Sequence, residues 1–162
     1  METVNAIVET PKGSGVKYTY EPSSGFFFLK KVLPAGMVFP YDFGFIPETK
    51  GEDGDPLDIV IISEFNNYIG CKIECRLIGG LQAMQWPING KKNKIRNDRF
   101  LGVPVQSIIF EKVKNMRDLP ERLLSELKAF FIHYNKMQKK IFEIEGLCNA
   151  QKCFSIIKKS KG

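Results

Sequence analysis

The first two-thirds of the chain consist of short segments in which hydrophobic and polar residues alternate, a pattern typical of β-strands. In the clearest segment, alternate positions from Cys71 to Leu77 are apolar and single charged residues lie between them, so one face is expected to be buried. Two other segments flank the turn-forming residues 22–25, which predicts a hairpin. The expected strands are residues 16–20, 26–32, 57–62, 71–81 and 99–105.

The last third of the chain has a helical period. Its apolar residues recur every three or four positions, at Leu119, Leu123, Leu127, Phe130, Tyr134 and Met137. Asp118 and Glu121 predict a capping box at the start of this helix. We expect Gly146 to break the chain and residues 148–159 to form a second helix. Strands followed by two helices indicate an α+β fold, mainly β, in which two C-terminal helices pack on a small closed barrel.

Length and composition indicate one folded domain over residues 1–162, because the chain has no internal repeat and no linker. Its 43% hydrophobic and 26% charged residues exclude a disordered chain. No apolar run approaches the ~20 residues that a membrane span needs. The N-terminus has no basic start followed by an apolar stretch, so we expect no secretory leader, a cytoplasmic location and reduced cysteines.

Charge is distributed unevenly in this basic chain, which has a net charge of +6. Five of its 18 acidic residues lie within positions 48–58, and five basic residues lie within positions 91–99, beside the single acid Asp98. An acidic cluster in a basic protein indicates a metal cation that holds a phosphate-like anion. The alternative is a pair of solvated loops of opposite sign.

The acidic cluster has the residue types of a site for a hard cation. Asp53, Asp55 and Asp58 follow at spacings of two and three where a loop enters an expected strand. Carboxylates this dense repel one another unless a cation neutralises them, and Mg²⁺ prefers few carboxylates plus water. An EF-hand is excluded, because Leu57 and Asp58 occupy the positions of its third ligand and its glycine. An exposed turn whose aspartates cap backbone amides stays open as an alternative.

The segment Asp53–Asp58 resembles the D-G-D-P-x-D signature of soluble family I inorganic pyrophosphatases. Further matches follow in the family's order and at similar spacing, at residues 8–11, 17–18, 24–25, 39–47, 102–104 and 130–134. The resemblance covers about residues 5 to 150. It implies an OB-like five-stranded closed barrel with two helices, a cytoplasmic Mg²⁺-dependent enzyme of the short bacterial type, and a homo-oligomer, usually a hexamer.

The resemblance also implies roles for single residues. Asp53 and Asp58 resemble metal ligands, Asp55 the carboxylate that assists the attacking water, and Glu9 an acid at the edge of the site. The expected phosphate-binding residues are Lys17, Lys31, Arg99 and Tyr134. Pyrophosphate hydrolysis needs an activated water and a neutralised leaving phosphate, and divalent cations held by carboxylates supply both.

Several positions depart from the family pattern. Lys31 replaces an arginine and loses its bidentate fork, while Phe43, Thr19 and Asn135 replace a tyrosine, a glutamate and a lysine. In the second acidic motif, D-x-x-x-x-D-x-K, the three specified positions fall on Lys92, Asn97 and Arg99. Asp98 lies one residue away, and a shift at the strand entry would bring it in as a further metal ligand. These changes predict weaker metal binding, fewer metals, or a shifted substrate such as a longer phosphate chain.

Three functions follow as hypotheses. The first is hydrolysis of pyrophosphate with Mg²⁺, for which Mn²⁺ can substitute. The second is hydrolysis of another phosphoanhydride, such as a nucleotide or polyphosphate. The third is a barrel without catalysis that binds single-stranded nucleic acid or another polyanion through residues 91–99; the acidic triad opposes nucleic-acid binding by repelling phosphates.

The remaining chemically reactive residues favour structural roles. His133, the single histidine, is expected to be packed or at the surface, and Cys71 and Cys75 are expected in the core because a zinc site needs two more ligands. Trp86 lies near a predicted loop tip, where it would cover a pocket or a subunit interface.

Overall fold

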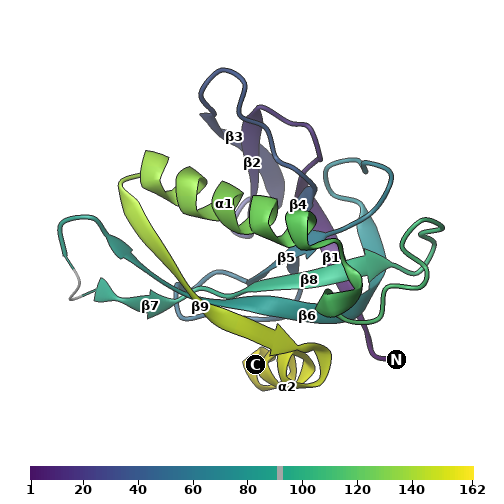
Figure 1. Ribbon diagram of the computed structural model, residues 1–162. Coiled ribbons are helices and arrows are strands. Elements are labelled where there is room, and N and C mark those ends of the chain that lie inside the picture. Colours follow the sequence, from purple (N-terminus) through teal and green to yellow (C-terminus); the bar gives the residue numbers. More distant parts are fainter. Residues whose placement is uncertain (91–92) are drawn as a thin grey trace.

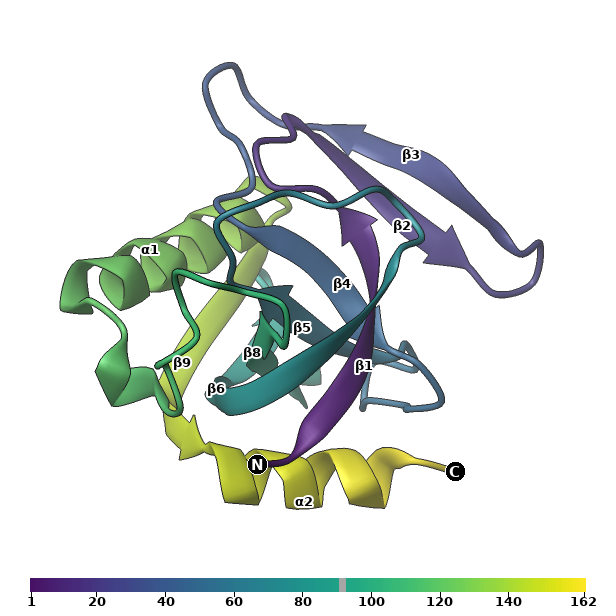
Figure 2. The ribbon, with the colours of Figure 1, turned by 90° about the vertical axis from the view of Figure 1, so that its right-hand side faces the viewer.

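A closed ring of five strands forms the centre of the computed structural model, which describes residues 1–90 and 93–162. Neighbouring strands in the ring follow the order β1–β4–β5–β8–β6, and pairing between β1 and β6 closes it. Their bounds are β1 Thr3–Thr10, β4 Asp42–Ile46, β5 Leu57–Ile61, β6 Lys72–Pro87 and β8 Arg99–Pro104. Figure 2 shows these strands curving around a common interior. The expected closed barrel is therefore confirmed, while Lys91 and Lys92 of the predicted basic run lie outside the described residues.

The remaining elements extend or cover the ring (Figure 1). β2 (Val16–Glu21) and β3 (Phe26–Val32) form the expected hairpin, as a separate sheet beside the barrel. β7 (Ile95–Arg96) and β9 (Lys140–Asn149) pair with β6, whose far end projects beyond the ring. The helices α1 (Glu121–Met137) and α2 (Ala150–Ser160) pack on different sides of the barrel.

The core has two halves because the central strand is buried on both faces. On β5, Ile59 and Ile61 pack in one hydrophobic cluster with residues of α2, and Val60 packs in the other with residues of α1. The continuous β-branched run Ile59–Ile61 therefore packs toward α2 on one face of the strand and toward α1 on the other. No helix among the described residues is both long and apolar enough to cross a membrane.

Two glycines allow close approaches within the ring. A Cβ on Gly44 would collide with the backbone of Ile7, so only glycine lets β4 lie this close to β1. Gly79 has a φ of +146° at a register shift between β6 and β8, and a Cβ there would lie 2.6 Å from Met116 Sδ. Both positions hold the small barrel closed.

The C-terminal third differs from the expectation in three places. Gly146 does not break the chain but lies within β9, next to a register shift opposite Gln82 on β6. The second helix begins at Ala150, where the Asn149 side chain caps Lys152 N. The predicted capping box at Asp118 and Glu121 is wrong, because the box lies one turn earlier, between Asn115 and Asp118, around a 3-10 helix.

The predicted stripe on α1 is only partly buried. Leu127 is buried as expected and Tyr134 is half-buried, whereas Met137 is 52% exposed at the end of the helix. Phe131 and Asn135, which the stripe omitted, are buried. The buried face of α1 therefore follows Leu127, Phe131 and Asn135, which is one residue later than the predicted stripe in its C-terminal half.

Candidate functional site

A cavity of about 230 Å³ lies where the barrel, the β2–β3 hairpin and the C-terminal part of α1 meet. Its lining residues fall into chemical groups: the acids Glu9, Asp53, Asp55 and Asp58; the bases Lys17, Lys30, Arg99 and Lys140; the amides Gln85, Asn97, Asn135 and Gln138; the aromatic residues Tyr20, Phe43, Phe45 and Tyr134; and Thr19, Pro22 and Pro56. Acids and bases thus share one cavity, which suits an anion held together with a cation.

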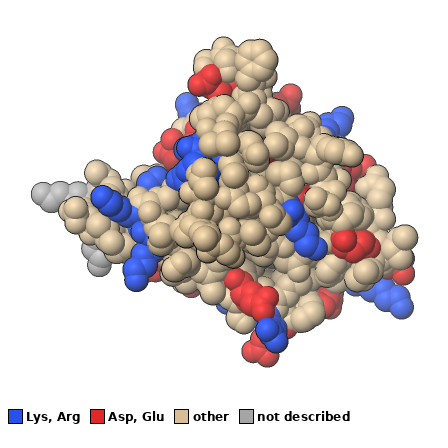
Figure 3. All heavy atoms as spheres, turned by 90° about the horizontal axis from the view of Figure 1, so that it is seen from above, with Lys and Arg blue, Asp and Glu red and all other residues tan. Residues whose placement is uncertain are grey.

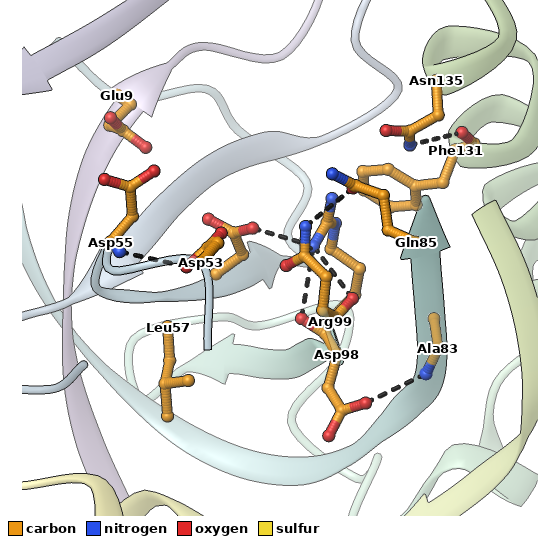
Figure 4. Close-up of polar contacts among 12 residues, drawn as sticks. Glu9, Asp53, Asp55, Leu57, Ala83, Gln85, Asp98, Arg99, Phe131 and Asn135 are labelled. Carbon is orange, nitrogen blue, oxygen red and sulfur yellow. Dashed lines mark hydrogen bonds and ion pairs between the residues drawn. The ribbon is translucent and has the colours of Figure 1, made fainter. Parts of the chain in front are cut away.

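Four carboxylates form one wall of the cavity, which we call the acidic wall: Glu9 from β1, Asp58 from β5, and Asp53 and Asp55 from the loop before β5 (Figure 4). The loop is built around Asp53, whose Oδ1 accepts a hydrogen bond of 3.0 Å from Asp55 N. The capping of a backbone amide by an aspartate, expected as an alternative to a cation site, therefore occurs within the site itself.

The loop is also tethered to distant parts of the chain. Gly51 N donates to Asp55 O at 2.8 Å, which closes the turn. Lys50 N donates to Ser160 O at 3.0 Å, and Arg96 N donates to Glu52 Oε2 at 2.6 Å. The position of the acidic wall therefore depends on both the end of α2 and the short strand β7.

Burial and crowding disfavour the ionised form of two of these acids. Burial raises the pKa of Asp58 to about 6; nearby Arg99 lowers it in part, and the charge of Glu9 adds to the increase. Desolvation also raises the pKa of Asp53, which the Asp55 amide opposes and the Asp55 carboxylate reinforces. A cation placed among these oxygens relieves both effects.

Lys17 is buried against the acidic wall and is 6% exposed. Its Nζ lies 3.8 Å from Glu9 Oε1 and 4.5 Å from the centre of the Phe43 ring. Burial lowers the pKa of Lys17, while the charge of Glu9 counteracts it. The other Glu9 oxygen accepts a bond of 2.8 Å from Tyr20 N, so Glu9 also fixes the hairpin to the barrel.

Arg99 lies beside the acidic wall, at the start of β8, and pairs in parallel register with Asp58. Its Nη1 lies 2.8 Å from Asp58 Oδ2 and 2.6 Å from Asn97 Oδ1. The guanidinium carbon lies 4.9, 5.2 and 5.7 Å from the ring centres of Phe142, Phe131 and Phe43. Its buried Nε has no hydrogen-bond partner among the described residues.

Neutral amides surround Arg99 and complete a second wall, which we call the amide wall: Gln85, Asn97 and Asn135. Asn97 Nδ2 donates to Gln85 Oε1 at 2.9 Å, and Asn135 Nδ2 donates to Phe131 O at 2.8 Å. In the described part of the chain, this side of the cavity contributes no carboxylate. The substitutions Asn97 and Asn135 therefore lie in the cavity, where the resemblance expects charged residues.

Most predicted site residues meet in this cavity, but two do not. Lys31 is not part of the lining; its Nζ lies 5.6 Å from the centre of the Tyr134 ring. Asp98 faces away, and its Oδ1 accepts from Ala83 N at 2.9 Å and from Arg96 Nη1 at 3.0 Å. Alternation explains this, because Asn97 and Arg99 point toward the cavity and the residue between them points to the other side.

Tyr134 serves both the core and the cavity. Its ring stacks with Phe130 at 5.7 Å and lies edge-on to Phe39 at 5.5 Å. Burial raises the pKa of Tyr134 to about 12, so its hydroxyl stays protonated and can donate to an anion. His133 is exposed, and Cys75 lies in the core as expected, whereas Cys71 is only half-buried at its edge; all four cysteines are free. Trp86 is 5% exposed, with Lys94 Nζ 5.0 Å from its ring centre.

Sequence reasoning missed Gln85, Gln138, Lys30 and Lys140 as lining residues. Gln85 lies in the part of β6 beyond the predicted strand, so recognising the longer strand would have pointed to it. Lys30 and Lys140 depend on local backbone irregularities, which are described below.

The donor set suits divalent cations, because every side chain of the acidic wall offers carboxylate oxygens. No group of three His, Cys, Asp or Glu side chains within residues 1–90 and 93–162 is close enough to enclose an ion alone. A cation here would therefore complete its coordination with water or with oxygens of a bound anion, as Mg²⁺ usually does.

Comparisons with known proteins agree with this chemistry. The family model described as "Inorganic pyrophosphatase" matches residues 6–162. The chain is 37% identical over 143 residues to an inorganic pyrophosphatase of Synechocystis sp., covering 88% of this chain and 80% of that protein. It is 34% identical to one of Sulfolobus acidocaldarius, with 90% and 82% covered. The crystal structure of inorganic pyrophosphatase from Thermus thermophilus superposes with a TM-score of 0.87 at 30% identity, covering 98% of this chain and 89% of that one.

Proposed function

The chain belongs to the inorganic pyrophosphatase family, and we propose that it hydrolyses pyrophosphate to two phosphates in the cavity between the acidic and amide walls. Divalent cations, Mg²⁺ first and Mn²⁺ as a substitute, are held in this proposal by Asp53, Asp55 and Asp58. Nucleic-acid binding and other phosphoanhydrides are not favoured, because the matched relatives are inorganic pyrophosphatases.

One observation carries the proposal: four carboxylates and two buried cations, Lys17 and Arg99, line the same cavity. Pyrophosphate carries several negative charges, so it needs both the cations of the protein and metal ions that the carboxylates hold. When bound, such an ion lowers the pKa of a coordinated water and neutralises phosphate charge.

The residues of the chain supply the remaining steps. The Asp55 carboxylate has no hydrogen-bond partner among the described residues, so it is free to accept a proton from the attacking water. The water attacks one phosphorus atom, and the bond from that phosphorus to the bridging oxygen breaks. Lys17, Arg99 and the Tyr134 hydroxyl donate to phosphate oxygens of the bound pyrophosphate.

Two predicted residues take other roles in this proposal. Asp98 is left out of the ligand set, because Ala83 N and Arg96 already use its carboxylate. Lys31 acts indirectly, since its ammonium lies over the ring of Tyr134. With acids on one wall alone, we expect divalent cations to bind more weakly than in members with acids on both walls.

We further propose that the protein acts in the cytoplasm as a homo-oligomer, a hexamer by resemblance. Light scattering of the purified protein measures this directly, since a hexamer has six times the mass of one chain.

The experiment that tests the proposed function measures phosphate release from pyrophosphate. We expect release with Mg²⁺, slower release with Mn²⁺, and none after chelation by EDTA. Asp55→Asn should lower kcat by at least about 100-fold, because it removes the proton acceptor. Glu111→Gln is the matched control: Glu111 is exposed and outside the cavity, so the loss of its charge should leave kcat unchanged. Undiminished turnover in Asp55→Asn would refute the role.

A further inference from the structure

Lys30 lines the cavity because the hairpin contains a β-bulge. Lys17 on β2 pairs with Lys31 on β3, but the next residue, Tyr18, pairs with Leu29, so Lys30 has no partner across the hairpin. Strict alternation would direct Lys30 to the face opposite Lys31. A bulge inserts one residue and re-aims its side chain, and Lys30 accordingly lines the same cavity as Lys17.

Lys140 reaches the cavity through a second irregularity, where α1 turns into β9. Lys139 has a φ of +58°, which is unusual for a residue with a side chain. Gln138 N and Lys139 N donate to Asn135 O and Lys136 O, so the last turn of the helix fixes this reversal. β9 then begins with Lys140 at the cavity. Strained backbone that places a side chain in a binding site points to a function for that side chain.

These two lysines differ from the other cations of the cavity in lacking counter-ions. Lys17 lies near Glu9, and Arg99 is paired with Asp58. In the described part of the chain, no carboxylate lies within ion-pair distance of Lys30 or Lys140. Both are exposed at the cavity, so their charges face its open side.

The same lysines act together on a neighbour. Burial and the charges of Lys30, Lys140 and Lys17 together lower the pKa of Lys31 to about 8. The ammonium groups of Lys30, Lys140 and Lys17 therefore lie close enough to that of Lys31 to repel it. Figure 3, which looks down on α1 and the hairpin, shows Lys and Arg atoms at several separate places on this face, one group of them left of its centre. An uncompensated positive region at the mouth of a cavity attracts an anion.

We infer that Lys30 and Lys140 form a phosphate-binding pair at the open side of the cavity, which holds the outer phosphate of bound pyrophosphate. The inference rests on the proposed function. The inner phosphate lies between the acidic wall and Arg99, and the pair binds the phosphate that points to solvent. A lysine ammonium on a flexible four-carbon chain can follow that phosphate as it becomes the leaving group.

The test compares Lys30→Met, Lys140→Met and the double variant with the wild type and with Lys114→Met. Lys114 is exposed, lies outside the cavity and has no ion pair among the described residues, so this control removes the same charge elsewhere. We expect each single variant to raise the KM for pyrophosphate about fivefold and the double variant about 20-fold, with kcat changed less than about threefold. The control should leave both constants unchanged.

A binding measurement makes the test independent of turnover. Isothermal titration calorimetry with methylenediphosphonate, a non-hydrolysable analogue, should show the same ranking of affinities in the presence of Mg²⁺. If the wild type binds the analogue but does not hydrolyse pyrophosphate, the proposed function fails and the binding pair is still tested.

Three results would overturn the inference. One is an unchanged KM and analogue affinity in the double variant. Another is an equal loss in the Lys114→Met control, which would indicate a general effect of net charge. The third is a double variant that loses affinity for inorganic phosphate but keeps its affinity for the analogue. That result would assign the pair to free product instead of bound substrate. Circular dichroism verifies that each variant is folded. If Lys140→Met is unfolded, the comparison of Lys30→Met with the wild type and the control still tests the inference.

Discussion

The two walls of the cavity differ in charge and in the way their side chains are held. The acidic wall combines strand residues with a loop, and its carboxylates are fixed mainly by backbone amides, as in Asp53 and Glu9. On the amide wall, side chains hold one another: Asn97 binds Gln85 and also accepts a bond from Arg99. The acidic wall is thus suited to divalent cations and the amide wall to the anion. This chain therefore places cation binding and anion binding on different walls, whereas two acidic motifs would both bind cations.

Arg99 links the walls, and removing it should have the largest effect. Arg99→Met leaves the largely buried Asp58 carboxylate without its partner, so we expect the free energy of unfolding to fall by about 3 kcal/mol. Urea denaturation measures this. Adding Asp58→Asn should restore part of the loss, because the unpaired charge is then gone. Arg122→Met is the control: it breaks an exposed pair with Glu126 and should cost less than about 0.5 kcal/mol. A cost as small as the control's for Arg99→Met would contradict a link between the walls.

The walls should also differ in their response to pH. The pKa of Asp58 is raised from 3.8 to about 6 in the folded protein, so between these values the folded state binds more protons than the unfolded state. The free energy of unfolding of the metal-free protein should therefore fall as pH rises from about 4 to about 6, by about 2 kcal/mol from this residue.

Denaturation in EDTA at a series of pH values measures this slope. Asp58→Asn should flatten it, whereas Glu111→Gln, an exposed acid outside the cavity, should leave it unchanged. If the free energy of unfolding changes with pH to the same extent in the wild type and in both variants, Asp58 does not cause the slope.

A carboxylate added to the amide wall should give that wall some of the affinity for divalent cations that the acidic wall has. Asn97→Asp places an acid beside Arg99 Nη1, which also binds Asp58, and we expect Mn²⁺ to bind about five- to tenfold more tightly because an anionic oxygen is added. Titration followed by electron paramagnetic resonance of free Mn²⁺ measures the affinity. Asn66→Asp, at an exposed residue outside the cavity, is the matched control. Equal affinities in both variants would mean that the amide wall does not face the cations.

The sequence could predict the barrel and the acidic wall because both depend on local patterns. The Asp53–Asp58 segment is continuous, and the helix that carries Tyr134 has a regular period. β9 was missed because its partner is β6, far away in the chain, and Gly146 marks an irregularity in that pairing instead of an end. A strand whose stability depends on a distant partner leaves a weak local signal.

The errors at the site have the same origin in cross-strand register. Asp98 was expected in the cavity, but alternation around Asn97 and Arg99 turns it outward. Lys30 was not expected, because the bulge that re-aims it depends on how β3 pairs with β2. In both cases a shift of one residue decides which side chain meets the substrate, and only the paired strands define that shift.

The bond from Lys50 N to Ser160 O has a consequence for protein synthesis. A ribosome releases the N-terminal residues first, so Asp53 and Asp55 emerge more than one hundred residues before the segment that anchors their loop. Until α2 has emerged and docked, the loop lacks that anchor, and the nascent barrel cannot yet arrange its carboxylates as in the finished protein. We therefore expect the loop that carries Asp53 and Asp55 to reach its final arrangement only after the residues of α2 have been synthesised.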